Sequence, residues 1–239
     1  MRKPLLFLAA ICIAGTCATA PALAQAAKQK GVGAAPVTEP KSVPAVVPAP
    51  ADPQGEAKLI VEGFRSAKFG MNEADVRAAI ARDFGAKPDA IKSQDNPAEL
   101  TRSVLLTVPD LLPNGGTAEV SYVFGYKSKS LIQVGTVWSK TTDPALTPER
   151  LFSNANILRA HFLGEGFKPD SIAVNTPVNG GVLMFRGSDA KDRSVILLLQ
   201  GTFEAKENNQ RILTPTGLLL FYVADTKSPD VFKLPPGQF

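Results

Sequence analysis

Cysteine and histidine are almost absent from this chain of 239 residues. Both cysteines, Cys12 and Cys17, lie near the start, and His161 is the only histidine. Once the first segment is removed, as argued below, no thiol nucleophile, disulfide or cysteine-ligated metal is possible. Any histidine-based nucleophilic device or metal site would have to use His161. The sequence therefore predicts no cofactor and no metal site, and an apolar core must supply the stability.

Signatures of nucleotide, calcium and hydrolase chemistry are also missing. The chain has no P-loop, no spaced-aspartate calcium loop and no Gly-x-Ser-x-Gly turn. Asp189 and Asp192 form a carboxylate pair, but their place in a predicted hairpin turn indicates solvated turn formers. His161 lies next to Phe162 at the end of a predicted helix, where the imidazole is favourable beside the helix C-terminus, and this favours a structural or surface role. These absences disfavour an enzyme; the alternative is an exported hydrolase that uses carboxylates or a Ser–Lys pair.

Charge of one sign does not accumulate along the chain. The formal net charge is +4, and removal of Arg2 and Lys3 leaves 24 basic against 22 acidic residues. The charges are interspersed, so the sequence predicts no nucleic-acid partner. Weak association with an anionic membrane or a cell-wall polymer stays open.

The first 24 residues have the form of a secretory signal peptide. Arg2 and Lys3 precede a short apolar run, and Ala22 and Ala24 place small residues where a signal peptidase reads them. We expect cleavage between Ala24 and Gln25 and a periplasmic or secreted product. The apolar run is too short to span a bilayer, so the mature chain is predicted to have no transmembrane span.

Residues 25–58 are rich in proline and alanine. Six prolines interrupt any helix or ladder and favour extended, polyproline-like chain. This segment is predicted to be a linker, either a tether that holds the folded part away from a surface or a plain spacer after the cleavage site.

Residues 59–141 read as a first α+β unit. Asn72 is a good helix N-cap, apolar residues recur at helical spacing after it, and Gly85 ends the helix. Three strand-like runs follow at 102–108, 118–126 and 131–138.

Residues 142–226 repeat this order, and residues 227–239 form a C-terminal tail. Thr147 caps a second helix, and strand candidates cover 181–186, 194–201 and 217–224. The repetition predicts an internal repeat and an α+β fold of two tandem helix-plus-three-stranded antiparallel sheet units packed together. The last two strands are apolar on both faces, so we expect the first unit to cover their second face; the linker or a partner could do so instead.

Tyr126 and Trp138 are the candidate partner-binding residues. Both lie at predicted strand ends, where they would be exposed, and Tyr and Trp dominate interface hot spots. Tyr122 and Phe124 are expected in the core.

The stretch Phe69-Gly70-Met71-Asn72-Glu73-Ala74-Asp75-Val76 resembles the start of the exported BamE/SmpA domains and of the related beta-lactamase-inhibitor-protein-like fold. The lipoprotein cysteine of the BamE group is missing, and Thr147 and Pro148 replace Gly-Met in the second half. The resemblance implies binding or assembly through a sheet face and identifies no partner. The hypothesis is an exported, non-catalytic binding or adaptor protein of the bacterial cell envelope, with an envelope protein as its candidate partner.

Overall fold

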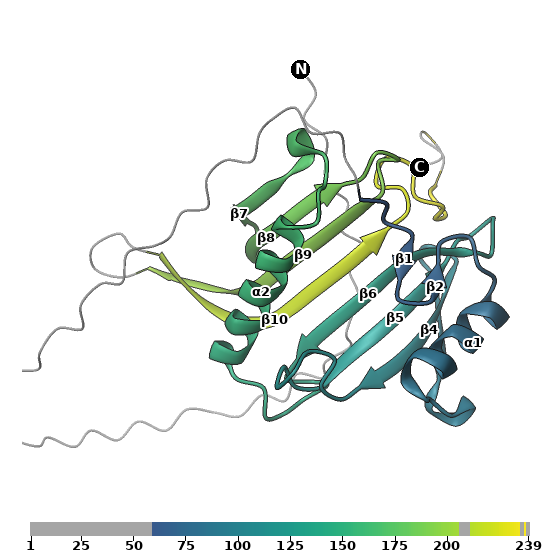
Figure 1. Cartoon of the computed structure of the whole chain (residues 1–239), viewed down its shortest axis with the longest axis horizontal. Helices are drawn as coiled ribbons and strands as arrows, with labels where there is room; N and C mark the ends of the chain where they lie inside the picture. Colours follow the sequence, from purple (N-terminus) through teal and green to yellow (C-terminus); the bar gives the residue numbers. More distant parts are fainter. Residues whose placement is uncertain (1–58, 206–210, 235–236, 238–239) are drawn as a thin grey trace, which may run out of the picture. The chain divides into compact units, whose positions relative to one another are not determined.

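The computed structural model describes residues 59–205, 211–234 and 237 (Figure 1). The predicted signal peptide and linker therefore lie outside the described residues. The elements follow the order β1 (Gly63–Phe64), β2 (Ala67–Lys68), α1 (Glu73–Phe84), η1 (Pro88–Ala90), β3 (Lys92–Asn96), β4 (Thr101–Val108), β5 (Ala118–Phe124), β6 (Leu131–Ser139), α2 (Pro148–Leu163), η2 (Pro169–Ser171), β7 (Ala173–Val178), β8 (Gly181–Ser188), β9 (Ser194–Ala205) and β10 (Arg211–Val223).

The strands form one eight-stranded antiparallel sheet in the order β3-β4-β5-β6-β10-β9-β8-β7, and β1 pairs with β2 in a separate hairpin. The central pair joins β6 to β10, with Trp138 opposite Leu218 and Val134 opposite Tyr222. The prediction of two helix-plus-three-stranded units is therefore wrong. The described chain is mainly β, because the edge strands that would have bounded two separate sheets pair with each other instead.

Both helices begin, and α1 also ends, where the sequence predicts. The Asn72 side chain accepts a hydrogen bond from the backbone N–H of Asp75, and Gly85 ends α1 in the left-handed conformation. In α2, Thr147 accepts from the N–H of Arg150 and Pro148 occupies the first turn. The two helices cover the same face of the sheet (Figure 1).

The sequence predicts neither the short β1–β2 hairpin nor the two edge strands of the eight-stranded sheet, β3 and β7. β3 has the sequence KSQDN and is mostly exposed, and β7 is exposed at every position after its first. An edge strand with no buried face carries no apolar alternation. The structure also extends β10 before the predicted start at residue 217. Residues 211–215 pair only with β9, and the register shifts between Pro215 and Gly217. Proline is tolerated in a strand at such an irregularity.

The helix-covered face holds the two larger clusters of buried side chains. One gathers around α2 and includes Phe162, Leu197 and Leu218, and the other gathers around α1 and includes Ile80 and Tyr122. The buried positions of α1 and α2 supply the apolar stripes that the sequence predicted.

A third cluster lies on the opposite face of β8, β9 and β10. It includes Ile196, Leu198, Leu219 and Phe221, which alternate with the helix-facing residues of the same strands. The expectation that the first half covers this face is wrong, because that half extends the sheet sideways through β6. Within the described part of the chain, no helix is long and apolar enough to cross a membrane.

Candidate functional site

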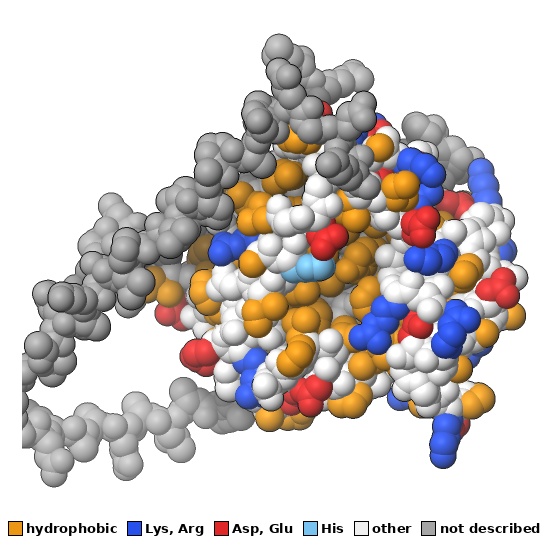
Figure 2. Space-filling view, in the orientation of Figure 1, with side chains coloured by type: hydrophobic (Ala, Val, Ile, Leu, Met, Phe, Trp, Pro, Cys, Tyr) orange, Lys and Arg blue, Asp and Glu red, His pale blue; other side chains and the backbone are white. Residues whose placement is uncertain are grey.

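A cleft of about 190 Å³ lies between the chain that enters the fold and the end of α2. One wall is residues 59–63 with Arg65 and Lys68, and the other is the last turn of α2 with Glu165. Val195 of β9 and Tyr222 of β10 lie beneath. In Figure 2 the single histidine stands beside an acidic side chain at the edge of a hollow with an apolar floor. Three parts of the chain that are far apart in sequence thus meet at one opening.

The entering wall is fixed by the turn between β8 and β9. Asp189 is fully buried, and its Oδ2 accepts a 2.9 Å hydrogen bond from the N–H of Val61. Its Oδ1 accepts from the N–H groups of Lys191 and Arg193, at 2.8 and 2.9 Å. The Arg193 guanidinium donates to the Val61 carbonyl at 3.0 Å. The interpretation of Asp189 as a solvated turn former is therefore wrong, since this carboxylate satisfies buried backbone donors.

Aromatic rings form the floor. The Tyr222 ring contacts Phe162, which also lines the cleft, with centroids 6.3 Å apart, and Phe64, which lies outside the lining, with centroids 5.4 Å apart. Phe162 in turn stacks on Phe185 at 5.5 Å. Burial, together with the nearby Glu165 carboxylate, raises the pKa of Tyr222 to about 12. The phenol therefore stays neutral, and the floor is an aromatic surface close to the negative charge of Glu165.

The cations of the rim already have partners. Lys68 Nζ lies 3.3 Å from Glu62 Oε2. The Arg65 guanidinium lies 4.5 Å from the Phe84 ring centroid and donates to the carbonyl of Asp83. The Glu165 carboxylate pairs with neither of these cations. Its contact among the described residues is the His161 imidazole, with Nδ1 3.4 Å from Oε1. Glu165 is the carboxylate of this rim with the weakest compensation.

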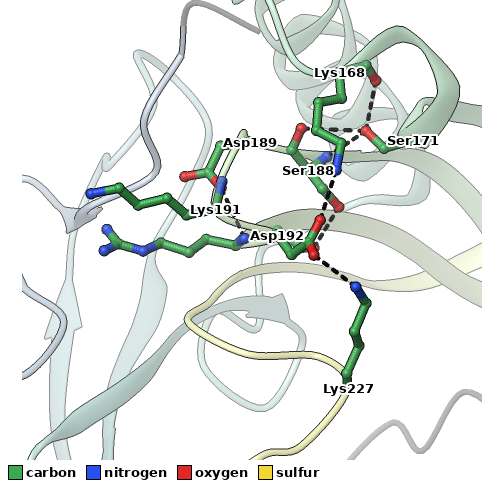
Figure 3. Close-up of polar contacts among 9 residues, drawn as sticks. Lys168, Ser171, Ser188, Asp189, Lys191, Asp192 and Lys227 are labelled. Carbon is green, nitrogen blue, oxygen red and sulfur yellow. Dashed lines mark hydrogen bonds and ion pairs between the residues drawn. The ribbon is translucent and has the colours of Figure 1, made fainter.

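A second polar cluster surrounds Lys168 at the β8–β9 turn (Figure 3). Lys168 Nζ and Lys227 Nζ each lie 2.7 Å from a carboxylate oxygen of Asp192. The hydrogen bond from Lys168 lowers the pKa of Asp192 to about 2, and the same bond raises the pKa of Lys168. Asp192 is half-exposed at this turn, as predicted for a turn former.

This cluster also contains two serines beside the lysine, the pattern that a Ser–Lys hydrolase would need. Ser171 Oγ donates to the Lys168 carbonyl at 2.7 Å and accepts from the N–H of Ser188 at 2.8 Å. A lysine that acts as a general base needs a lowered pKa, and this one is raised. The arrangement fixes η2 against the hairpin and gives no support to Ser–Lys chemistry.

The two predicted partner-binding residues do not form a patch. Trp138 is 1% exposed and packs in the cluster around α2, so the expectation that it is exposed is wrong. Tyr126 is half-buried, and its ring meets Phe232 edge-on at 5.5 Å. Trp138 and Tyr126 lie toward opposite ends of the β5–β6 pair, because β6 starts at Leu131 next to the Tyr126 turn and ends at Ser139.

His161 lies in the last turn of α2 with its side chain 57% exposed, at the surface position that the sequence predicts. Glu165, Tyr222 and Asp189 were not predicted as site residues. A tyrosine within the apolar run of β10 was the one available signal, because a hydroxyl in a strand buried on both faces needs a polar surrounding.

Across 59–205 and 211–234, no three acidic or histidine side chains gather closely enough to hold a metal ion.

Comparisons of the sequence with family models and with curated proteins, and of the fold with solved structures, returned no match.

Proposed function

We propose that this protein is an exported, non-catalytic binding protein of the bacterial cell envelope, and that a partner polypeptide binds in the cleft between the entering chain and α2. The observation that carries the proposal is the combination of an aromatic floor, centred on Tyr222, with a charged rim. Apolar cores with polar rims and aromatic anchors are the usual composition of protein-binding sites.

The construction of the cleft supports binding over chemistry. Its walls are held by backbone hydrogen bonds to Asp189 and by packed rings, so the surface exists before a partner arrives. A preformed surface saves the entropy that ordering would cost, which is how affinity is gained without new contacts. The alternative, a hydrolase with a Ser–Lys pair, is disfavoured by the ion pair that keeps Lys168 protonated.

Export is the part of the proposal that rests on residues 1–24 alone. The basic start and the small residues at Ala22 and Ala24 support removal of this segment. The intact mass of protein from an envelope fraction should correspond to a chain that begins at Gln25. A chain that retains Met1, or one with lipid on Cys17, would contradict export as a free protein.

The binding proposal is tested by closing the cleft. The predicted mature chain has no cysteine, so His161→Cys and Lys92→Cys each provide a single thiol for a bulky polyethylene-glycol maleimide. His161 lies at the rim of the cleft, and Lys92 is exposed on the edge strand β3. Tagged proteins are then incubated with envelope extract, and the captured proteins are compared.

We expect the adduct at position 161 to abolish capture of a partner that the unmodified variant retains, and the adduct at position 92 to leave capture unchanged. Equal capture by both adducts would show that the partner binds elsewhere. Absence of any captured partner with either unmodified variant would count against a binding protein.

A further inference from the structure

The floor of the cleft combines aromatic rings with a carboxylate, a combination that recognises cations. Tyr222 and Phe162 line the cleft with ring centroids 6.3 Å apart, and Glu165 lines it close enough for its charge to act on Tyr222. Aromatic faces attract ammonium and guanidinium groups that lie within about 6 Å of the ring centroid. A carboxylate beside such a face adds a charge-assisted hydrogen bond.

We propose that the cleft receives the side chain of one arginine or lysine from the partner polypeptide, with its aliphatic stem over Tyr222 and its cationic head at Glu165. This inference rests on the proposed function, since it names the chemistry of the partner at that same cleft. It makes Tyr222 and Glu165 the residues that determine specificity.

The charges on the rim leave Glu165 as the carboxylate for an incoming cation. Lys68 pairs with Glu62, and the Arg65 guanidinium lies over the Phe84 ring and donates to the Asp83 carbonyl. An incoming cation meets Glu165, whose described contact is the imidazole of His161 at 3.4 Å. The raised pKa of Tyr222 agrees with this geometry, because the Glu165 charge contributes to it.

The size of the cleft fits one long side chain. Its volume is about 190 Å³, below the range of about 300 to 1,000 Å³ that drug-sized ligands occupy. The wall opposite Glu165 consists of residues 59–63, and Asp189 and Arg193 hold it through the backbone of Val61. A side chain that enters between this wall and α2 reaches Val195 and Tyr222 at the floor.

The test uses the chain beginning at Gln25 and three peptides: acetyl-Ala-Gly-Arg-Gly-Ala-amide and the same peptide with lysine or glutamine in the centre. Isothermal titration calorimetry measures each dissociation constant. We expect the arginine and lysine peptides to bind at least about tenfold more tightly than the glutamine peptide, as the loss of a hydrogen bond to a charged group implies.

Two variants assign the effect to the cleft. Glu165→Gln should remove the preference for the basic peptides, whereas Glu149→Gln, an exposed carboxylate at the other end of the same helix, should keep it. Circular dichroism confirms that both variants fold.

Absence of measurable binding by all three peptides, or equal binding of them, would overturn this inference. So would a preference for the basic peptides that survives Glu165→Gln. None of these results affects the proposed function if a maleimide adduct at position 161 still blocks partner capture; in that case the cleft binds a partner of different chemistry.

Discussion

The backbone N–H of Val61 donates a 2.9 Å hydrogen bond to the carboxylate of Asp189, although the two residues lie 128 positions apart in the sequence. Asp189 also accepts from two N–H groups of its own turn. One buried side chain therefore closes the β8–β9 turn and fixes the segment at which the predicted linker enters the fold. The wall of the cleft depends on this one carboxylate.

Asp189→Ala is expected to lower the free energy of unfolding by about 3 kcal/mol, because it leaves buried backbone donors without an acceptor. Asp170→Ala, at an exposed position, should change it by less than about 0.5 kcal/mol. Urea denaturation followed by circular dichroism measures both. Equal stability of the two variants would show that Asp189 does not hold the entering chain.

The ion pairs of Asp192 predict a specific loss of stability in acid. Its pKa is lowered to about 2 in the folded protein, against about 3.9 in an unfolded chain. The ionised carboxylate therefore stabilises the fold above about pH 4, and this contribution disappears as the pH falls toward 2.

We expect the native chain to melt slightly above Asp192→Asn at pH 5 and the two melting temperatures to converge near pH 2. The effect is small and should shrink with added salt, because the pair is exposed. A difference in melting temperature that is independent of pH would contradict this role of the charge.

Trp138 is the single tryptophan, and its burial gives an optical test of the core. The native protein should show blue-shifted tryptophan emission that iodide barely quenches, and unfolding in guanidinium should shift the emission to the red. Emission typical of a solvated indole in the native protein would place Trp138 at the surface, where the sequence had suggested a partner-binding residue.

The continuous sheet predicts cooperative folding of the whole described region. β6 and β10 pair from Gln133 to Ser139 and from Gly217 to Val223, so separation of the halves exposes two long apolar edges. Residues 55–239 should melt in one transition, and residues 142–239 alone should be poorly soluble or bind a hydrophobic dye. A soluble, monomeric second half would mean that the β6–β10 pairing contributes little to its stability.

The local elements were predictable because their signals are local. Asn72 and Gly85 mark the limits of α1, and Thr147 and Pro148 mark the start of α2, through hydrogen bonds and backbone conformations that involve a few neighbouring residues. The strand interiors follow from apolar runs that need no knowledge of their partners.

The sheet order was not predictable in the same way. The pairing of β6 with β10 joins segments that only the finished fold brings together, and the exposed edge strand β3 has no apolar pattern. A signal for the central position of β10 did exist, since strands buried on both faces read as continuous apolar runs. The same apolar run also fits a strand whose second face is covered by another layer, which is the arrangement that we predict from the sequence.

The candidate site depended on the same long-range order. Glu165 and Tyr222 each have an ordinary local context, and they meet only because α2 packs across β10. The predicted exposure of Trp138 is wrong because it considers the strand alone and not the residues that pack beside it in the fold. Trp138 belongs to the same buried cluster as Leu146, which precedes α2, and Leu151, in the first turns of α2.

The central claim, that a partner polypeptide lies in the cleft, is tested most directly by position-specific photo-cross-linking. Benzophenone maleimide is attached to the thiol of Lys68→Cys at the cleft rim, or of Lys92→Cys on β3, and the adducts formed in envelope extract are identified by mass spectrometry. We expect position 68 to give a discrete partner adduct and position 92 to give none. Adducts from position 92 with none from position 68 would contradict the account.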